Sequence, residues 1–176
     1  MQDVDEDRPV EDLSLFGYFV KCLKCYAVFD GRARRMELCG YFLFRVVIGI
    51  AWPILCVILL GSLDGSWEGI ILTWLPNLAF LTPELALFAR RLHDIGKSGR
   101  LFLRLYVLFY GFLVIAIVVA NVGYLVLAGI FGLLLFGMSV VLLIFFAQAF
   151  FIDSKPGSNP YGPSPKYPNG NPNKLP

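Results

Sequence analysis

Residues 90–104 read RRLHDIGKSGRLFLR and separate two halves of the chain that are each almost wholly apolar. This stretch holds the only histidine and five of the 15 lysines and arginines. Gly96 suits the position just after a helix C-terminus, and Ser98 suits the cap of a following helix. The stretch is therefore expected to form a polar turn between two helical units.

Hydrophobic residues make up 57% of the 176 residues, whereas soluble proteins average roughly 45–50%. A soluble core of this size cannot bury such an excess. The net charge of +2 gives no reason to expect nucleic acid binding. The composition indicates an all-α integral membrane protein.

Four apolar segments are each long enough to cross the roughly 30 Å hydrocarbon core of a bilayer as a helix. They cover about residues 42–63, 70–89, 101–122 and 125–152. One helix spanning the last two segments would exceed what a bilayer needs, and Asn121 with Gly123 supplies turn residues. We predict four transmembrane helices, arranged as two hairpins.

The second of these spans is the least lipid-like. It contains Pro76 and Pro83, and a proline inside a helix leaves the carbonyl four residues earlier without its backbone donor. We therefore expect a bent helix whose freed backbone groups find partners on neighbouring helices.

The flanking segments are polar. Residues 1–12 form an acidic tail, expected to be disordered, and their charge argues against a secretory signal peptide. Residues 13–40 are expected to hold an amphipathic helix on the membrane surface, within about 13–29, followed by a basic junction. Residues 153–176 are rich in Pro, Gly, Asn and Ser and are predicted to be disordered.

The distribution of lysines and arginines predicts how the protein is oriented in the membrane. All of them lie before or just inside the first span, around the 90–104 stretch, or after the fourth span. The connectors between spans one and two and between spans three and four contain none. Because positive charge is retained in the cytosol, both termini and the 90–104 stretch are predicted to be cytosolic.

Three polar stretches, in this order around apolar spans, resemble the bacterial inner-membrane proteins grouped as domain of unknown function 805. They read YAVFDGRARR at 26–35, RRLHDIGKSG at 90–99 and GSNPYGPSP at 157–165. The chain departs from the family pattern at Arg34, Cys39 and Arg100, where Ser, Trp and Trp are usual. The resemblance implies a multi-pass protein of the bacterial inner membrane, and it carries no activity with it.

Polar residues outside the spans are candidates for contact with the headgroups of anionic phospholipids. A helix N-terminus near clustered cations is suited to binding phosphate, although helix capping and topology would explain most of the same residues. The candidates are Arg32, Arg35, Arg90, Arg91, His93, Lys97, Ser98 and Arg100, with Asn159, Tyr161, Gly162 and Pro163 as a tail motif.

Three charged residues lie within the predicted spans, and together with Asn77 they are the polar candidates there: Arg45, Glu84 and Arg104. An ionisable residue inside a span is a functional candidate by default. Glu84 is expected to pair with Arg45 or Arg104, or else the arginines extend to the interface and Glu84 is neutral.

The sequence contains little evidence for an enzymatic or a metal-binding site. Gly96, Lys97 and Ser98 lack the glycine that a phosphate-binding loop needs five positions earlier, where Arg91 stands. His93 with Asp94 lacks a neighbouring nucleophile or further metal ligands. Cys22 and Cys25 form a single CxxC, near which Cys39 and His93 could lie, so no metal or cofactor is predicted.

The sequence leaves three function classes. The first is a non-enzymatic inner-membrane protein whose basic cytosolic face contacts anionic phospholipid or a membrane protein partner. The second is a small transporter or channel, working as a homo-oligomer and using Asn77 and Glu84 of the second span. The third, a membrane-embedded enzyme acting through His93 and Asp94, has the weakest support.

Overall fold

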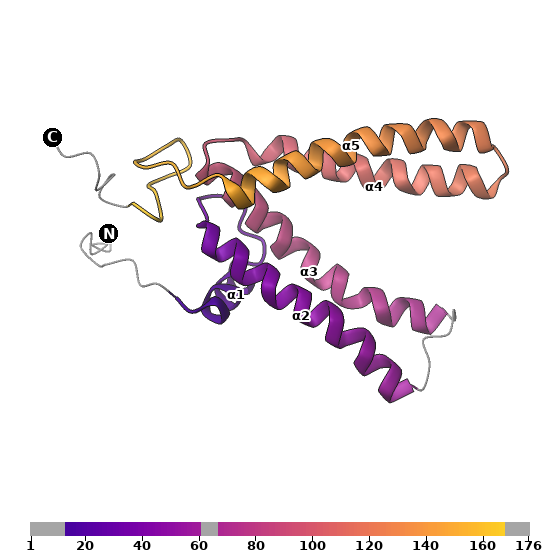
Figure 1. The fold of residues 1–176 in the computed structure, drawn as a ribbon, viewed down its shortest axis with the longest axis horizontal. Coiled ribbons are helices and arrows are strands. Elements are labelled where there is room, and N and C mark those ends of the chain that lie inside the picture. The colour runs from indigo at the N-terminus through magenta and orange to yellow at the C-terminus, as the bar shows by residue number, and fades with distance from the viewer. Residues whose placement is uncertain (1–12, 61–66, 168–176) are drawn as a thin grey trace.

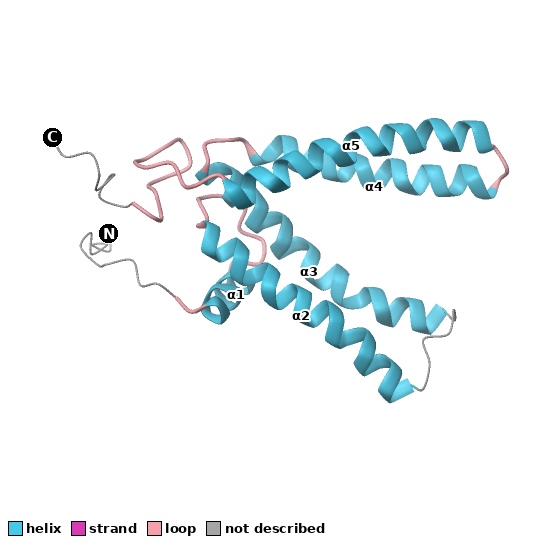
Figure 2. Cartoon of the chain, in the orientation of Figure 1, coloured by secondary structure: helices cyan, strands magenta, loops and turns pink. Residues whose placement is uncertain are grey.

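The computed structural model describes residues 13–60 and 67–167. They form five helices: α1 (Leu15–Lys24), α2 (Arg35–Leu60), α3 (Trp67–Asp94), α4 (Gly99–Asn121) and α5 (Leu125–Phe151). Figure 2 shows helices joined by loops, and no strand occurs in the described ranges beyond one isolated bridge between Asn159 and Gly162. The all-α prediction is confirmed.

The long helices form two pairs, α2 with α3 and α4 with α5, which diverge from a common end (Figure 1). At this end lie α1 and residues 25–34, 95–98 and 152–167, which we call the loop end. Within the described residues the predicted spans agree with these helices except near the loop end, and the predicted end of the first span at 63 lies outside them. There α2 begins at Arg35 and α3 continues to Asp94, so the RRLHD motif is the end of a helix rather than a loop.

The turn between α3 and α4 follows the predicted capping. Gly96 has a φ of 79°, its N–H donates to the His93 carbonyl at 2.9 Å, and the Lys97 N–H donates to the Leu92 carbonyl at 2.8 Å. These two bonds form the Schellman ending of a helix. Ser98 accepts a hydrogen bond from the Arg100 N–H and caps α4. Both capping assignments are confirmed.

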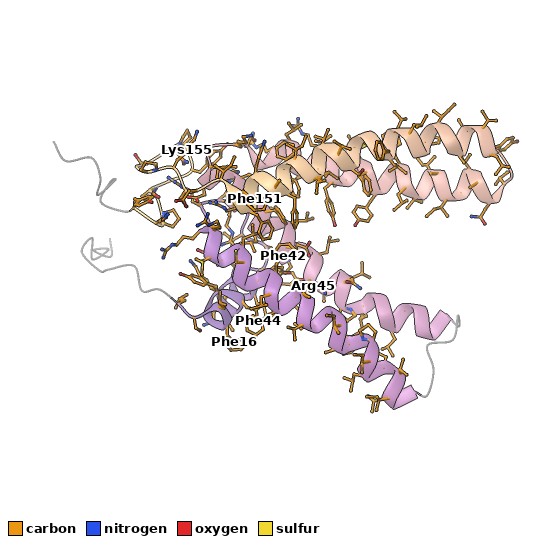
Figure 3. The ribbon with its side chains drawn as sticks, viewed as in Figure 1. Phe16, Phe42, Phe44, Arg45, Phe151 and Lys155 are labelled. Atoms are coloured by element: carbon orange, nitrogen blue, oxygen red, sulfur yellow. The ribbon has the colours of Figure 1, made fainter. Side chains whose placement is uncertain are left out.

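The buried core lies close to the loop end. Phe42 of α2 contacts Phe88 of α3 and Phe146 and Phe150 of α5, with ring centroids 5.4–5.6 Å apart (Figure 3). Phe88 also stacks on Phe102 of α4. All four long helices therefore meet in one aromatic cluster, while their remaining lengths extend away from it as two arms.

Away from this core the helices expose large apolar side chains. Ile58, Val126 and Leu133 are 72%, 83% and 75% exposed. Surfaces of this kind are unfavourable in water and suit contact with lipid. Within the described residues, three helices are long and apolar enough to cross a membrane: residues 35–59, 99–121 and 125–151. The helix α3, with its prolines and charged end, is not among them.

The carbonyls freed by the prolines of α3 are both paired. Pro76 leaves the Leu72 carbonyl without its backbone donor, and the indole N–H of Trp52 donates to it at 2.9 Å. Pro83 likewise frees the Ala79 carbonyl, which accepts from the Tyr26 hydroxyl at 2.6 Å. Trp52 belongs to the neighbouring helix α2, as expected, whereas Tyr26 lies in the turn after α1. The two carbonyls that the prolines free are thus paired from outside α3.

Removing either donor should destabilise the protein. Trp52→Phe leaves the part-buried Leu72 carbonyl unpaired, which costs about 1–3 kcal/mol. Tyr26→Phe leaves the more exposed Ala79 carbonyl unpaired, which costs less. We expect each variant to lower the melting temperature of the protein in detergent. The control is Tyr124→Phe, whose ring is 64% exposed at the turn between α4 and α5. Equal melting temperatures for all three variants would contradict the role of these donors.

Candidate functional site

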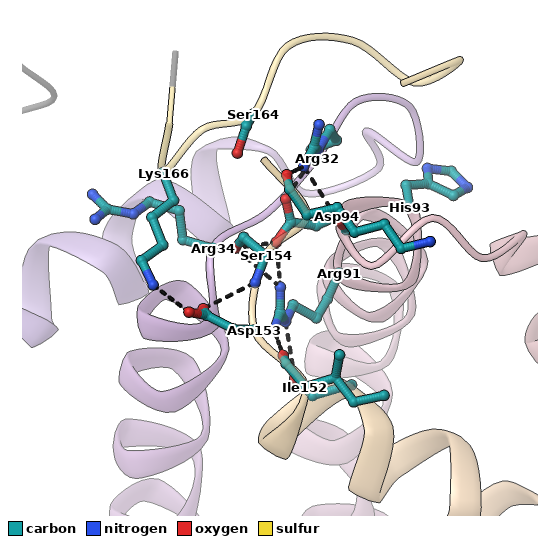
Figure 4. A network of polar contacts seen from close by, with 12 residues as sticks. Arg32, Arg34, Arg91, His93, Asp94, Ile152, Asp153, Ser154, Ser164 and Lys166 are labelled. Atoms are coloured by element: carbon teal, nitrogen blue, oxygen red, sulfur yellow. Dashed lines mark hydrogen bonds and ion pairs between the residues drawn. The ribbon is translucent and has the colours of Figure 1, made fainter. Parts of the chain in front are cut away.

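Asp94, the last residue of α3, is the centre of a buried polar network (Figure 4). Its carboxylate accepts hydrogen bonds from Arg32 Nε at 2.9 Å, from Arg91 one turn earlier, and from the Ser154 hydroxyl. The side chains of both arginines and of Asp94 are at most 1% exposed. We call Arg32, Arg91, Asp94 and Ser154 the loop-end network.

Arg91 connects α3 to the end of α5. Its Nε donates to the Ala149 carbonyl at 2.8 Å, and another guanidinium nitrogen donates to the Ile152 carbonyl. The last carbonyls of a helix have no backbone donors, and the negative end of the helix dipole favours a cation there. Arg91 therefore caps α5 while it pairs with Asp94.

Arg32 connects the junction before α2 to the C-terminal segment. Its guanidinium donates to the carbonyls of Gly157 at 2.8 Å and of Gly162 at 3.3 Å, and also to that of Lys155. It reaches the backbone carbonyl of Asp94 at 3.2 Å as well. One side chain thus joins three segments that are far apart in the sequence.

The C-terminal segment differs from the predicted disordered tail. Residues 153–167 follow a defined path across the loop end, held by Arg32 and by the Ser154 hydroxyl. Composition alone indicates disorder because the segment has no core of its own. It is ordered here because its carbonyls accept the guanidinium donors of Arg32. The predictions for residues 1–12 and 168–176 lie outside the described residues.

The tail motif forms a tight turn on His93. The Asn159 amide donates to the His93 carbonyl at 2.9 Å, and the Asn159 and Gly162 backbones bond to each other in both directions. The Tyr161 ring stacks on the imidazole with centroids 3.8 Å apart, and Pro163 is exposed. The central stretch, the basic junction and the tail motif are therefore in contact with one another at the loop end.

His93 contributes packing and a hydrogen bond. Its Nδ1 lies 3.1 Å from the Gly31 carbonyl, and because a carbonyl only accepts, Nδ1 carries a proton. Burial lowers the pKa of His93 below its usual 6.5, although the bond to Gly31 acts in the opposite direction. The neutral imidazole is therefore the form that the fold favours.

This burial predicts a loss of stability in acid. In the unfolded chain His93 gains a proton near pH 6.5, whereas in the folded chain it does so at lower pH. Its contribution to stability is complete above pH 6.5 and decreases as the pH falls from there towards the folded pKa. We expect the melting temperature of His93→Gln to decrease less between pH 7.5 and pH 5 than that of the parent. An equal decrease would contradict this role.

A second buried polar cluster joins α1 to α2. Glu37 is fully buried and accepts a hydrogen bond from Lys21 Nζ at 2.8 Å. Cys22 lies beside it, and burial together with the charge of Glu37 raises the pKa of the Cys22 thiol to about 12. The thiol stays protonated at neutral pH, which does not suit a redox or metal-binding role. In the described part of the chain, no three His, Cys, Asp or Glu residues are grouped as metal ligands.

The basic candidates divide into two sets. Arg32, Arg90, Arg91 and His93 are buried at the loop end, and three of them bond to protein acceptors there. Contact of these residues with headgroups stays a prediction, and the bonds of Arg32, Arg91 and His93 within the protein are what the structure adds. Lys97 is partly exposed and bonds to Gln148. Arg35, Ser98 and Arg100 are exposed at the same end.

Of the two alternatives for the candidates within the spans, the ion pair of Glu84 with Arg45 or Arg104 does not occur among the described residues. Arg45 bonds to the Asn77 amide oxygen and lies over the Phe80 ring, 5.2 Å from its centroid, rather than pairing with Glu84. Asn77 is therefore the residue that links α3 to the guanidinium of α2. Arg104 is exposed on α4.

Sequence reasoning missed Ser154, Trp52 and Tyr26. Nothing in the letters around Ser154 distinguishes it from other serines of a Pro-rich tail. Trp52 and Tyr26 could have been proposed, because each proline needs a donor from outside its helix and indole and phenol groups carry one. Asp94 could also have been proposed as the centre, since it is the only acid in the 90–104 stretch.

Known proteins resemble this chain over most of its length. The family described as "Protein of unknown function (DUF805)" matches residues 26–163. The inner membrane protein YhaI of Escherichia coli K12 is 33% identical over 150 residues, which is 85% of this chain and 96% of YhaI.

A second relative, the inner membrane protein YhaH of the same strain, is 30% identical over 149 residues, with the same two shares covered. No solved structure matches the chain. The residues matched by the family include all four members of the loop-end network. The chain is a membrane protein, and it belongs to the DUF805 family.

Proposed function

We propose that the chain is a non-enzymatic protein of the bacterial inner membrane with four transmembrane helices. In this proposal α3 crosses the bilayer along with α2, α4 and α5, and the loop end lies in the cytosol. Its exposed basic residues bind the headgroups of anionic phospholipids.

The four-span topology is supported by the loop-end network. Arg32 precedes α2, Asp94 ends α3 and Ser154 follows α5. The Asp94 carboxylate nevertheless accepts hydrogen bonds from both Arg32 and Ser154. If α2 crosses the bilayer, α3 must return the chain to the same side, because Arg32 and Asp94 are in direct contact. The same reasoning makes α4 and α5 a second returning pair.

The proposed orientation rests on charge. Described lysines and arginines lie at or near the loop end, whereas the turn of residues 122–124 at the other end of the α4–α5 pair contains none. Positive charge favours the cytosolic side. Escherichia coli relatives that are inner membrane proteins fit this location.

One observation supports contact with anionic lipid. Arg32 and Arg91 bond within the loop-end network, whereas other cations at the same end are exposed. Arg100 and Arg104 are one turn apart on α4 and therefore on one face of the helix. Arg35 is exposed at the start of α2. Long arginine side chains at helix ends extend to the headgroup region.

The helix α1 fits the same surface. Its Phe19 packs against Phe44 and Tyr41 of α2, while Phe16 is 58% exposed beside Phe44. Lys24 is exposed in its last turn. An amphipathic helix with exposed aromatic and basic side chains is suited to lie in the interface of the membrane.

The test is lipid retention. We expect phosphatidylglycerol and cardiolipin to remain with the parent protein after gentle purification from Escherichia coli membranes, as measured by native mass spectrometry. Replacing Arg35, Arg100 and Arg104 with Gln should reduce the ratio of anionic lipid to phosphatidylethanolamine by on the order of a hundredfold, at about 1 kcal/mol per basic residue.

The matched control replaces the same three arginines with Lys, which keeps the charge. We expect this variant to retain anionic lipid. Equal lipid ratios in the parent and the Gln variant would overturn lipid contact at these residues. If another protein co-purified with the parent in a stoichiometric amount and was absent from the Gln variant, the surface would be assigned to a protein partner instead.

A further inference from the structure

Arg90 is a buried cation at the loop end whose side chain has no partner in the described part of the chain. It lies in the last turns of α3 and is 4% exposed. Its Nε and Nη2 are both buried, and neither has a hydrogen-bond acceptor among the described residues. The buried basic residues beside it, Arg32, Arg91 and His93, all bond to protein acceptors. The burial of Arg90 is therefore not explained by the loop-end network.

The carboxylates close to the end of α3 are occupied by other groups. Asp94 accepts hydrogen bonds from the three other members of the loop-end network, and Asp153 pairs with Lys166. No ion pair among the described residues includes Arg90. A guanidinium keeps its positive charge in proteins, and burying that charge without a counter-ion is strongly unfavourable. An anion from outside the chain would remove this penalty.

Glu37 is the carboxylate of this region that could replace an outside anion. Its Oε1 accepts from Lys21 and from the Arg34 N–H at 3.4 Å, while its Oε2 is buried without a partner among the described residues. The preceding amide, that of Ala33, donates to the Arg90 carbonyl at 3.1 Å. Consecutive amides thus bond to Glu37 and to Arg90, yet the two side chains form no ion pair with each other.

We infer that Arg90 is the binding residue for a phosphate group at the loop end. The Nε and Nη2 donors lie on one edge of the guanidinium plane, and two oxygens of a phosphate accept such a pair of donors at once. These are the two nitrogens that are buried without acceptors. A free phosphate ion and the phosphate of a lipid headgroup offer the same oxygens, so this chemistry is common to both sources.

Binding requires a small shift of the junction before α2. Arg90 is almost wholly covered, and Ala33, which bonds to its carbonyl, is fully buried. The site takes one phosphate group per chain, which goes beyond the general contact of exposed arginines with the membrane. It uses none of the residues Arg35, Arg100 and Arg104, so it does not depend on the headgroup contacts proposed for them.

The experiment is calorimetric titration of the full chain, purified in a maltoside detergent without phosphate, with two probes. The probes are inorganic phosphate and dioctanoyl phosphatidylglycerol. We expect at least one of them to bind the parent saturably at a single site per chain. Arg90→Met, which removes the charge and keeps an unbranched side chain, should weaken that probe by about tenfold or more, the loss expected for one charged hydrogen bond.

The two probes also separate the two sources of phosphate. Binding of inorganic phosphate alone assigns the site to the free ion, and binding of the lipid alone assigns it to a headgroup. Either result supports the inference when Arg90→Met loses it, and so does binding of both. Arg90→Lys keeps the charge without the planar fork and should bind with an affinity between those of the parent and Arg90→Met.

The variant with Gln at Arg35, Arg100 and Arg104 is the matched control. It should bind the probe at the same single site as the parent, because Arg90 is intact. If lipid retention did not depend on those three arginines while Arg90 bound its probe, only the proposed headgroup contacts would fail. If neither probe bound the parent, only the inference about Arg90 would fail.

Melting temperatures distinguish an outside anion from an ion pair with Glu37. Without either probe, Arg90→Met should melt at or above the temperature of the parent, because it removes a buried charge that has no partner. A clearly lower melting temperature, or failure to fold, would assign Arg90 to a partner within the protein and overturn the inference. Equal affinity of the probe for the parent and Arg90→Met would also overturn it.

Discussion

Asp94→Asn is expected to destabilise the protein by about 3–5 kcal/mol, because it leaves two buried guanidinium groups without their anion. Folded proteins have only about 5–15 kcal/mol of stability in total. We therefore expect little monodisperse Asp94→Asn protein in detergent, and a melting temperature far below that of the parent in whatever is recovered.

The matched control for this variant is Asp153→Asn. Asp153 also bonds to a cation at the loop end, Lys166, but both side chains are substantially exposed. Hydrogen bonding to Lys166 lowers the pKa of Asp153, yet an exposed ion pair contributes at most about 1 kcal/mol. If the two variants melted at the same temperature, Asp94 would not be the centre of the network.

Gly99→Ala is expected to have the second largest effect, although it adds only one methyl group. A Cβ atom on Gly99 would lie 2.8 Å from both the Cα and Cβ atoms of Ala89. Because Ala89 is part of the α3 backbone, the two helices must separate. Overpacking of this kind costs about 1–3 kcal/mol, and we expect a clear decrease in melting temperature.

Gly111→Ala in the same helix supplies the comparison. A Cβ atom there meets nothing within 4 Å, and alanine favours the helix over glycine by about 1 kcal/mol. This variant should melt at or above the temperature of the parent. Should both alanine variants shift the melting temperature in the same direction, the close approach of α4 to α3 would be contradicted.

Periodicity and capping made much of the architecture predictable. The apolar segments are helices, and Gly96 and Ser98 define the turn between α3 and α4. These features depend on residues close together in the sequence. The need of Pro76 and Pro83 for outside donors was predictable for the same reason, whereas the identity of the donors was not.

The roles of the arginines were not predictable from their positions. Clustered cations near helix ends are expected in membrane proteins whatever they bind, so the sequence does not distinguish Arg32 and Arg91 from Arg35 and Arg100. The distinction depends on Asp94 and Ser154, which lie 62 and 122 positions after Arg32 and approach it only in the folded chain. The defined conformation of residues 153–167 could not be predicted for the same reason, because it depends on contacts with residues distant in the sequence.

The central claim is that two helical hairpins return the chain to one side of the membrane, where the loop-end network closes. Cysteine accessibility in intact Escherichia coli cells tests it most directly, with a membrane-impermeant maleimide applied to Tyr124→Cys and Ser158→Cys proteins and to the parent. Both positions are exposed, one at the turn between α4 and α5 and one in the tail. We predict labelling of Tyr124→Cys above the parent and none of Ser158→Cys until the cells are permeabilised. Labelling of Ser158→Cys in intact cells would contradict the account.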